Sequence, residues 1–207
     1  MSLFAPDTPD GFDYREDFIS AAEEAALLDA ITRVEFSDFE MRGVVARRRV
    51  AFFGASYDQG DAPALPIPEF LAPLIERAST WAGVQPAAFA MALINQYPPG
   101  APIGWHRDAP QYDIVFGVSL VSACRMRFRP YASPATKVRL KPDTTSERGR
   151  RTATNEIVLT PRSAYVMKGD ARSDYEHSIP PVAELRYSIT FRTLRVGRSL
   201  RLPRTRG

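Results

Sequence analysis

Two segments in the first part of the chain carry apolar residues at helical spacing. The first follows Ser20-Ala21-Ala22-Glu23, which fits a capping box in which the serine and glutamate satisfy free N–H groups at a helix start. Its apolar positions predict a helix over roughly 20–33. The second stripe runs from Leu71 to Trp81, and Gly83 is a plausible stop, so we expect a helix that ends near Ala82.

After Ala87 the pattern changes to short apolar runs between turns, which is typical of strands. Proline contributes 18 of the 207 residues, which argues against a bundle of long helices. Several short strands at this spacing predict a sandwich or barrel, so the fold class is mainly β (α+β) in a single domain. The expected strands are 89–97, 113–122, 124–129, 156–160, 164–167, 174–178 and 186–194.

The positive charge of the chain is concentrated in two stretches. Arg125 to Arg151 holds nine basic and two acidic residues, and Arg192 to Gly207 holds six arginines and no acid. Residues 131–154 are polar, basic and poor in large apolar groups, so we interpret them as a long loop inserted between two strands. Both stretches favour an anionic partner such as nucleic acid, or they are only a solvated loop and a frayed tail at 195–207.

Several classes of protein can be excluded. The longest purely apolar run, Ala87 to Ile94, is far shorter than a membrane span requires, and the first residues lack the pattern of a secretory signal. The single cysteine, Cys124, excludes an internal disulfide and a multi-cysteine zinc site. A reducing, cytoplasmic setting is therefore the expectation, and Cys124 is expected to be a buried strand residue without a role.

Residues 36–60 interleave aromatic side chains with arginines. This composition suits stacking on bases and pairing with phosphate, but an edge hairpin with phenylalanines inward and arginines in water would look the same. Alternation along a strand puts Arg47 and Arg49 on one face and Arg48 on the other. The residues concerned are Phe36, Phe39, Phe52, Phe53, Tyr57, Arg42, Arg47, Arg48 and Arg49.

The only two histidines of the chain, His106 and His177, suggest a metal site. In an extended segment, His106 and Asp108 share one face while Arg107 points away. Two imidazole nitrogens and one carboxylate on one side of a metal form the facial triad of non-haem Fe(II) oxygenases. His177 is the one histidine left to complete such a set. Alternatively, His106 is a satisfied core histidine and Asp108 a turn residue.

The last predicted strand has two contrasting faces. Tyr187, Ile189 and Phe191 form an apolar face, and the opposite face consists of Arg186, Ser188, Thr190 and Arg192. If the polar face points into a barrel, its two arginines require an anion, because a buried unpaired cation is costly. A dicarboxylate such as 2-oxoglutarate would supply one through bidentate pairing. The alternative is that this face is the outer, hydrated side of the sheet.

Taken in order, these motifs resemble the AlkB family of Fe(II)/2-oxoglutarate-dependent dioxygenases. The resemblance spans roughly 10 to 194. Its motifs are Asn95-Gln96-Tyr97-Pro98-Pro99-Gly100, His106-x-Asp108, Pro161-Arg162-Ser163-Ala164-Tyr165, Glu176-His177-Ser178-Ile179-Pro180-Pro181 and Arg186-x5-Arg192. The best-known members have asparagine where this chain has Ser188, which weakens any expectation that Ser188 contacts the cosubstrate. The resemblance implies a double-stranded β-helix, or jelly roll, with two flanking N-terminal helices.

The resemblance also implies roles for individual residues. His106, Asp108 and His177 would bind Fe(II), and Arg186 would pair with the distal carboxylate of 2-oxoglutarate. Arg192 would lie near its other end and help to hold Asp108, and Asn95 and Tyr97 would hydrogen-bond the cosubstrate. Segment 36–60 matches the family's nucleotide-recognition lid in position. Residues expected to hold a substrate base are Arg47, Arg49, Tyr57 and Trp105.

The expected reaction consumes O2 and 2-oxoglutarate and releases succinate and CO2. The substrate expected from the basic segments is alkylated DNA or RNA, with formaldehyde released from an N-methyl group of a base. A base inside a duplex must be single-stranded or flipped out to reach a buried metal. The same chemistry on a protein side chain or a small molecule is the alternative, since fold does not determine substrate. We expect no membrane association and a monomer.

Overall fold

A computed structural model describes residues 8–41, 43–55, 64–131 and 154–195. Tyr57, most of the predicted 131–154 insertion and all but the first residue of the 195–207 segment lie outside these residues. No helix in the described part of the chain is long and apolar enough to cross a membrane.

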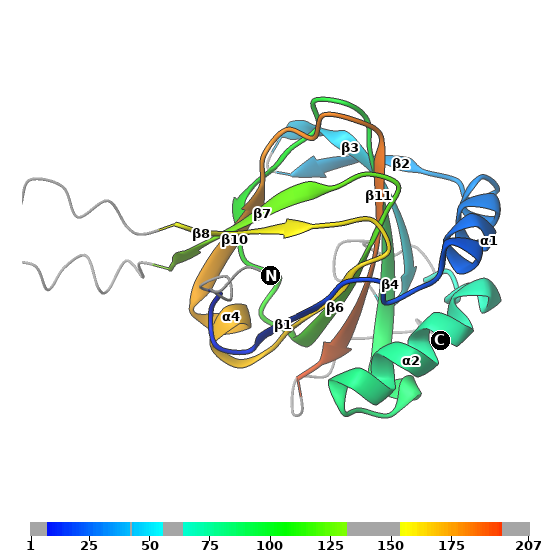
Figure 1. Cartoon of the computed structure of the whole chain (residues 1–207), viewed down its shortest axis with the longest axis horizontal. Coiled ribbons are helices and arrows are strands. Elements are labelled where there is room, and N and C mark those ends of the chain that lie inside the picture. The colour runs from blue at the N-terminus through cyan, green and yellow to red at the C-terminus, as the bar shows by residue number, and fades with distance from the viewer. Residues whose placement is uncertain (1–7, 42, 56–63, 132–153, 196–207) are drawn as a thin grey trace, which may run out of the picture.

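Eleven strands in the described residues form two antiparallel sheets, with two helices packed on one side of the larger sheet (Figure 1). The larger sheet has the order β1-β9-β6-β11-β4-β3-β2, and the smaller one β5-β10-β7-β8. The strands are β1 (Phe12–Arg15), β2 (Ser37–Met41), β3 (Val44–Gly54), β4 (Phe89–Tyr97), β5 (Ile103–His106), β6 (Tyr112–Leu120), β7 (Cys124–Pro130), β8 (Asn155–Leu159), β9 (Ala164–Met167), β10 (Tyr175–Ile179) and β11 (Arg186–Leu194). The helical elements are α1 (Ala21–Ile31), η1 (Glu69–Leu71), α2 (Ala72–Ala82), η2 (Pro86–Ala88) and α4 (Gly169–Ser173).

Both predicted helices are confirmed, and their ends have the expected local causes. Ser20 Oγ accepts a bond from the Glu23 backbone N at 3.2 Å, and Ser20 N donates to Glu23 Oε2 at 2.7 Å. This is the capping box predicted for α1. α2 ends at Gly83, whose φ of 74° lies in the left-handed region that glycine adopts without strain.

The fold has two apolar layers, one on each side of the larger sheet. Ile189 and Phe191 of β11 pack with Leu27, Leu74 and other residues in the layer under α1 and α2. Tyr97, Phe128 and their neighbours fill the space between the two sheets. The apolar face predicted for β11 therefore faces the helices, and its polar face is turned into the space between the sheets. Two packed antiparallel sheets confirm the expected jelly-roll class.

All seven predicted strands are present, with ends within one or two residues of the prediction. Strands β1 and β5 and the short helix α4 were not predicted. Each has only four or five residues, which is too few for a hydrophobic period to be recognised. Cys124 is buried in β7, as expected.

Segment 36–60 contains an edge hairpin, the plainer of its two interpretations. β2 pairs with β3 at the end of the larger sheet. Phe53 is buried, Phe36 packs against the layer under the helices, and Arg47 and Arg49 are exposed. β3 continues the sheet by pairing with β4, so one face of the hairpin adjoins the space between the sheets.

Candidate active site

Six strands and the segment after β5 bring polar side chains into one pocket between the sheets. From β11 come Arg186, Ser188, Thr190 and Arg192, and the sequence had predicted that these four share a face. From the other elements come Arg48, Asn95, Tyr97, His106, Asp108, Tyr165 and His177. The pocket therefore contains every residue predicted to hold the metal or the cosubstrate.

At one end of this pocket the two histidines and Asp108 adjoin one another. β5 and β10 pair so that His106 lies opposite His177, with ring centroids 4.2 Å apart. The Asp108 Oδ2 atom lies 3.7 Å from His177 Nε2. Within the described residues, no three His, Cys, Asp or Glu side chains already converge on one point as a complete ligand set. The three side chains are thus neighbours, but their donor atoms do not yet point at one common metal position.

The environment of Asp108 nevertheless fits a cation. Its Oδ1 atom accepts two bonds from Arg192, at 2.9 Å from Nε and 2.8 Å from Nη2. Its Oδ2 atom is buried and has no hydrogen-bond partner. Burial, the largest single effect, would raise the pKa of Asp108, but Arg192 and the other neighbouring cationic and imidazole groups together outweigh it and hold that pKa well below its usual range. A buried, ionised carboxylate with one uncommitted oxygen is a suitable metal ligand.

His177 is held in the uncharged form that a metal requires. Burial, followed by repulsion from His106, lowers the pKa of His177 from 6.5 to about 3, although Asp108 opposes this shift. His106 Nδ1 lies 2.9 Å from the Gly104 carbonyl oxygen. A proton donated from Nδ1 to that carbonyl leaves the lone pair of Nε2 available, which is the usual arrangement for a ligating histidine.

This pKa shift predicts a pH dependence for the metal-free protein. Unfolded His177 takes up a proton near pH 6.5, whereas the folded protein resists it down to about 3. The stabilisation is therefore complete above the unfolded pKa and is lost as pH falls through this window. In urea unfolding between about pH 7.5 and 5, the wild type should lose more stability than His177→Gln does. Equal losses in the two proteins would contradict the assignment of a buried neutral imidazole.

At the other end of the pocket a buried guanidinium has a free donor. Arg186 is 1% exposed, and its Nε and Nη2 atoms donate to Ser119 Oγ at 3.3 and 3.1 Å. The guanidinium carbon lies 4.9 Å from the centre of the Tyr97 ring. Its Nη1 atom is buried and lacks a hydrogen-bond partner. A buried cation with an unsatisfied donor is costly, so the arrangement fits an anionic ligand such as a carboxylate.

Asn95 connects the cosubstrate end of the pocket to the hairpin. Its Oδ1 atom accepts a bond from Arg48 Nε at 3.3 Å, and its Nδ2 atom donates to Ser188 Oγ at 3.4 Å. Ser188 thus lies in the pocket, although the expectation for its contact with cosubstrate was weak. Arg48 also stacks on Phe39, with the guanidinium carbon 4.3 Å from the ring centre.

The predicted substrate residues are not the ones that the structure brings to the pocket. Arg48 lines it, whereas Arg47 and Arg49 are exposed on the other face of β3. Arg49 donates instead to the Phe36 carbonyl at 2.6 Å. Trp105 also does not line the pocket, because it alternates with His106 along β5 and its ring packs under the Arg129 guanidinium at 4.4 Å.

Tyr165 also lines the pocket, although only its motif, and no role in the site, was predicted from the sequence. Its ring lies across Gly117, its partner in the pairing of β9 with β6. A Cβ atom at position 117 would come within 2.3 Å of Tyr165 Cζ and 2.6 Å of its hydroxyl oxygen. Burial, with Asp108 next, raises the pKa of Tyr165, so its phenol stays protonated and able to donate. The sequence signal for this contact was Gly117 itself, a glycine inside an otherwise apolar strand.

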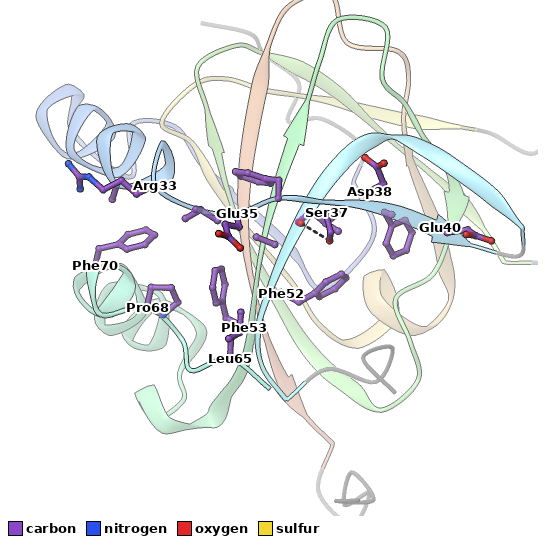
Figure 2. A pocket seen from close by; sticks show the side chains of 16 residues that line it. Arg33, Glu35, Ser37, Asp38, Glu40, Phe52, Phe53, Leu65, Pro68 and Phe70 are labelled. Carbon is purple, nitrogen blue, oxygen red and sulfur yellow. Dashed lines mark hydrogen bonds between the residues drawn. The ribbon is translucent and has the colours of Figure 1, made fainter. Parts of the chain in front are cut away.

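A more voluminous surface groove lies elsewhere. It measures about 990 Å³ and is bounded by the end of α1 and the β2–β3 hairpin. In Figure 2, Phe70 and Pro68 face Phe53 across this groove. Its charged lining residues, Glu35, Asp38, Glu40 and Arg33, are mostly acidic. This charge disfavours a polyanion, and none of the metal-ligand candidates lines the groove. The predicted metal and cosubstrate residues line the smaller pocket between the sheets instead.

Comparisons with known proteins agree with this geometry. Residues 16–195 match the model of the 2OG-Fe(II) oxygenase superfamily. A protein of Arabidopsis thaliana, "Alkylated DNA repair protein ALKBH8 homolog", is 27% identical over 176 residues, which cover 79% of this chain but only 49% of that protein. The chain thus spans about half the length of this relative.

Two solved structures share the fold at low sequence identity. OsALKBH1 matches with a TM-score of 0.65 and 14% identity over 88% of this chain and 98% of that one. A Pseudomonas putida prolyl-4-hydroxylase matches with a TM-score of 0.57 and 16% identity over 90% of this chain and 94% of that one. The family match covers most of the chain, and its members use Fe(II), 2-oxoglutarate and O2. The chain therefore belongs to the 2OG-Fe(II) oxygenase superfamily, and it is similar to AlkB homologues within it.

Proposed function

We propose that this dioxygenase oxidatively demethylates N-alkylated bases of DNA or RNA, with iron held by His106, Asp108 and His177. The observation that carries the site assignment is the pair of buried, unpartnered atoms in one pocket, Asp108 Oδ2 and Arg186 Nη1. The first is a carboxylate oxygen without a hydrogen-bond donor, and the second is a guanidinium donor without an acceptor. A metal beside the first and a carboxylate beside the second would satisfy both.

Fe(II), 2-oxoglutarate and O2 together supply the power to hydroxylate a C–H bond, with release of succinate and CO2. The protein's own residues prepare the site for these groups. Arg192 keeps Asp108 ionised, and burial keeps His177 neutral. Arg186 binds the distal carboxylate of 2-oxoglutarate, and Asn95 and Tyr97 donate to the cosubstrate from β4. The packed walls of the pocket exclude bulk water, which strengthens each of these interactions.

Tyr165 adds a hydroxyl group to the cosubstrate side of this pocket. Along β6 and β11, Gly117 lies one inward-facing position from Ser119, the residue that holds Arg186. The phenol that covers Gly117 is therefore placed to donate to the carboxylate that Arg186 binds.

Tyr165→Phe should weaken 2-oxoglutarate binding about tenfold, the usual cost of one hydrogen bond to a charged group. Anaerobic calorimetric titration of the Mn(II)-loaded protein would measure it. Tyr187→Phe is the control, because that phenol accepts a bond from Gln96 at 2.8 Å on the opposite face of β11. Equal affinities in Tyr165→Phe and wild type would remove Tyr165 from the cosubstrate site.

The nucleic-acid substrate is supported by the side of the pocket that the hairpin forms. Arg48 is half-buried, stacks on Phe39 and lines the pocket, so it can pair with a phosphate or stack on a base that enters. The two basic stretches add electrostatic attraction for a polyanion. The printed name of the Arabidopsis relative refers to alkylated DNA repair. A target base would have to be unpaired or flipped out to enter.

Arg48→Gln should separate substrate binding from the rest of the reaction. We expect the KM for a methylated oligonucleotide to rise about tenfold, because one stacked and charged contact is lost, while the metal affinity is retained. Steady-state assays with increasing oligonucleotide would measure the change. Arg33→Gln is the control, since that exposed arginine pairs with Asp29 in α1. An unchanged KM in Arg48→Gln would show that the substrate does not approach over this side of the hairpin.

The proposed function is tested with single-stranded oligonucleotides that carry N1-methyladenine or N3-methylcytosine. Mass spectrometry should show loss of the methyl group only when both Fe(II) and 2-oxoglutarate are present. If 2-oxoglutarate is consumed and no methyl group is lost from DNA or RNA, the substrate is a protein side chain or a small molecule. The prolyl-4-hydroxylase match shows that this fold also serves an enzyme of that kind.

A further inference from the structure

The segment around Asp108 and the segment that leads into β10 are joined by two arginines. Each segment contributes one arginine, which donates to backbone carbonyls of the other. Arg172, in α4, is 4% exposed. Its Nη2 atom donates to the carbonyl oxygens of Ala109 at 2.5 Å and Tyr112 at 3.0 Å. Ala109 directly follows Asp108, so this guanidinium holds the backbone of the loop from which the Asp108 carboxylate projects.

Arg107 makes the reciprocal contact. Its Nη1 atom donates to the carbonyl oxygen of Ser173, the last residue of α4, at 2.9 Å. Its guanidinium carbon also lies 3.5 Å from the centre of the Tyr131 ring. Tyr131 N in turn donates to the Asp174 carbonyl at 2.7 Å. Residues 173 and 174 lead directly into β10, which carries His177.

α4 is itself fixed to the body of the fold. Ala171 N donates to the Asp10 carbonyl and Lys168 N to the Gly11 carbonyl, both at 2.9 Å. Gly11 has a φ of 86°, and a Cβ atom there would lie 2.2 Å from the Lys168 carbonyl oxygen. The N-terminal segment before β1 thus packs closely against α4, and Arg172 extends from a fixed support.

We propose that Arg172 and Arg107 are positioning residues that hold the backbone segments of Asp108 and His177 at a fixed separation before metal binds. This inference rests on the ligand set of the proposed function. Arg192 orients the Asp108 carboxylate, whereas Arg172 determines where the backbone of that residue lies. A planar guanidinium bonds two carbonyls at fixed geometry, which a lysine ammonium on a flexible stem cannot reproduce. Preorganised ligands bind metal more tightly because less order must be imposed on binding.

Co(II) titration of the metal-free protein, followed by visible absorption, tests this proposal without any turnover. Arg172→Lys and Arg107→Lys should each weaken Co(II) binding about tenfold or more, the range for residues that orient metal ligands, and should alter the absorption bands. Arg107 is exposed, so its variant keeps the test available if Arg172→Lys fails to fold. Arg162→Lys is the matched control, because Arg162, in the turn before β9, pairs with Glu24 of α1 outside the pocket.

The melting temperature of each metal-free variant separates positioning from simple structural support. If both lysine variants melt lower but bind Co(II) with wild-type affinity and spectrum, as Arg162→Lys should, the arginines only stabilise the fold and the proposal is overturned. If the wild type binds no Co(II), the ligand assignment itself is wrong and both proposals fail. Weaker binding in Arg172→Lys and Arg107→Lys, with wild-type binding in Arg162→Lys, supports the positioning role.

Discussion

Replacing Asp108 by alanine is expected to reduce turnover to background. The variant removes the one carboxylate among the three proposed ligands and leaves the Arg192 guanidinium, 12% exposed, without its partner. This uncompensated positive charge would repel any cation that approaches the two remaining histidines. Metal affinity and activity should therefore be lost together, and the folded protein should be less stable because a buried charge is unpaired.

Asp108→Asn distinguishes loss of the ligand from loss of the fold. The amide oxygen still accepts from Arg192, so the protein should fold, but the negative charge that attracts the metal is gone. Co(II) titration and succinate formation should both fail in Asp108→Asn and remain normal in Asp113→Asn, which changes a carboxylate with 55% side-chain exposure. Turnover retained in Asp108→Asn would disprove the facial-triad assignment.

Arg186→Gln is expected to raise the dissociation constant of 2-oxoglutarate by about a hundredfold or more, the usual cost of removing one partner of a buried charged pair. Arg186 is almost fully buried and its one unsatisfied donor, Nη1, faces the same pocket as Asp108. Glutamine keeps a donor but removes the charge and shortens the side chain. The distal carboxylate of 2-oxoglutarate would then be buried without a cation beside it.

The matched measurement is metal binding in the same variant. Arg186 and the metal ligands lie at different ends of the pocket, so Co(II) affinity should remain near that of the wild type. Anaerobic titration with 2-oxoglutarate would show the loss directly. Wild-type affinity for 2-oxoglutarate in Arg186→Gln would mean that the cosubstrate carboxylate binds elsewhere.

The sequence predicted best those features that depend on local periodicity. Alternation along β11 correctly grouped Arg186 and Arg192 on one face and Ile189 and Phe191 on the other. The capping box at Ser20 and the glycine at 83 predicted helix ends because these signals act within one turn. The order of the motifs pointed to an Fe(II)/2-oxoglutarate-dependent dioxygenase, and the match over residues 16–195 confirms that superfamily.

Periodicity could not show which face of β3 adjoins the pocket. It separated Arg48 from Arg47 and Arg49, but only the pairing of β3 with β4 determines which of them meets Asn95. The same alternation along the strand turns Trp105 to the face opposite that of His106. This alternation already argued against a place for Trp105 in the site.

Contacts between distant segments lay beyond local patterns. The position of Tyr165 over Gly117 depends on the pairing of β9 with β6. The reciprocal contacts of Arg107 and Arg172 depend on α4, whose five residues are too few to show a hydrophobic period. Both features arise from tertiary packing. The one sequence signal was the glycine at 117, which indicated the close approach of another side chain.

Demethylation of nucleic acid is tested most directly by measuring succinate and formaldehyde together. The wild type would be incubated with a methylated single-stranded oligonucleotide, Fe(II), 2-oxoglutarate and O2. We expect the oligonucleotide to stimulate succinate formation and to yield formaldehyde in an amount equal to the succinate whose formation it stimulates. Succinate formed at the same rate with and without the oligonucleotide, and without formaldehyde, would contradict demethylation of nucleic acid.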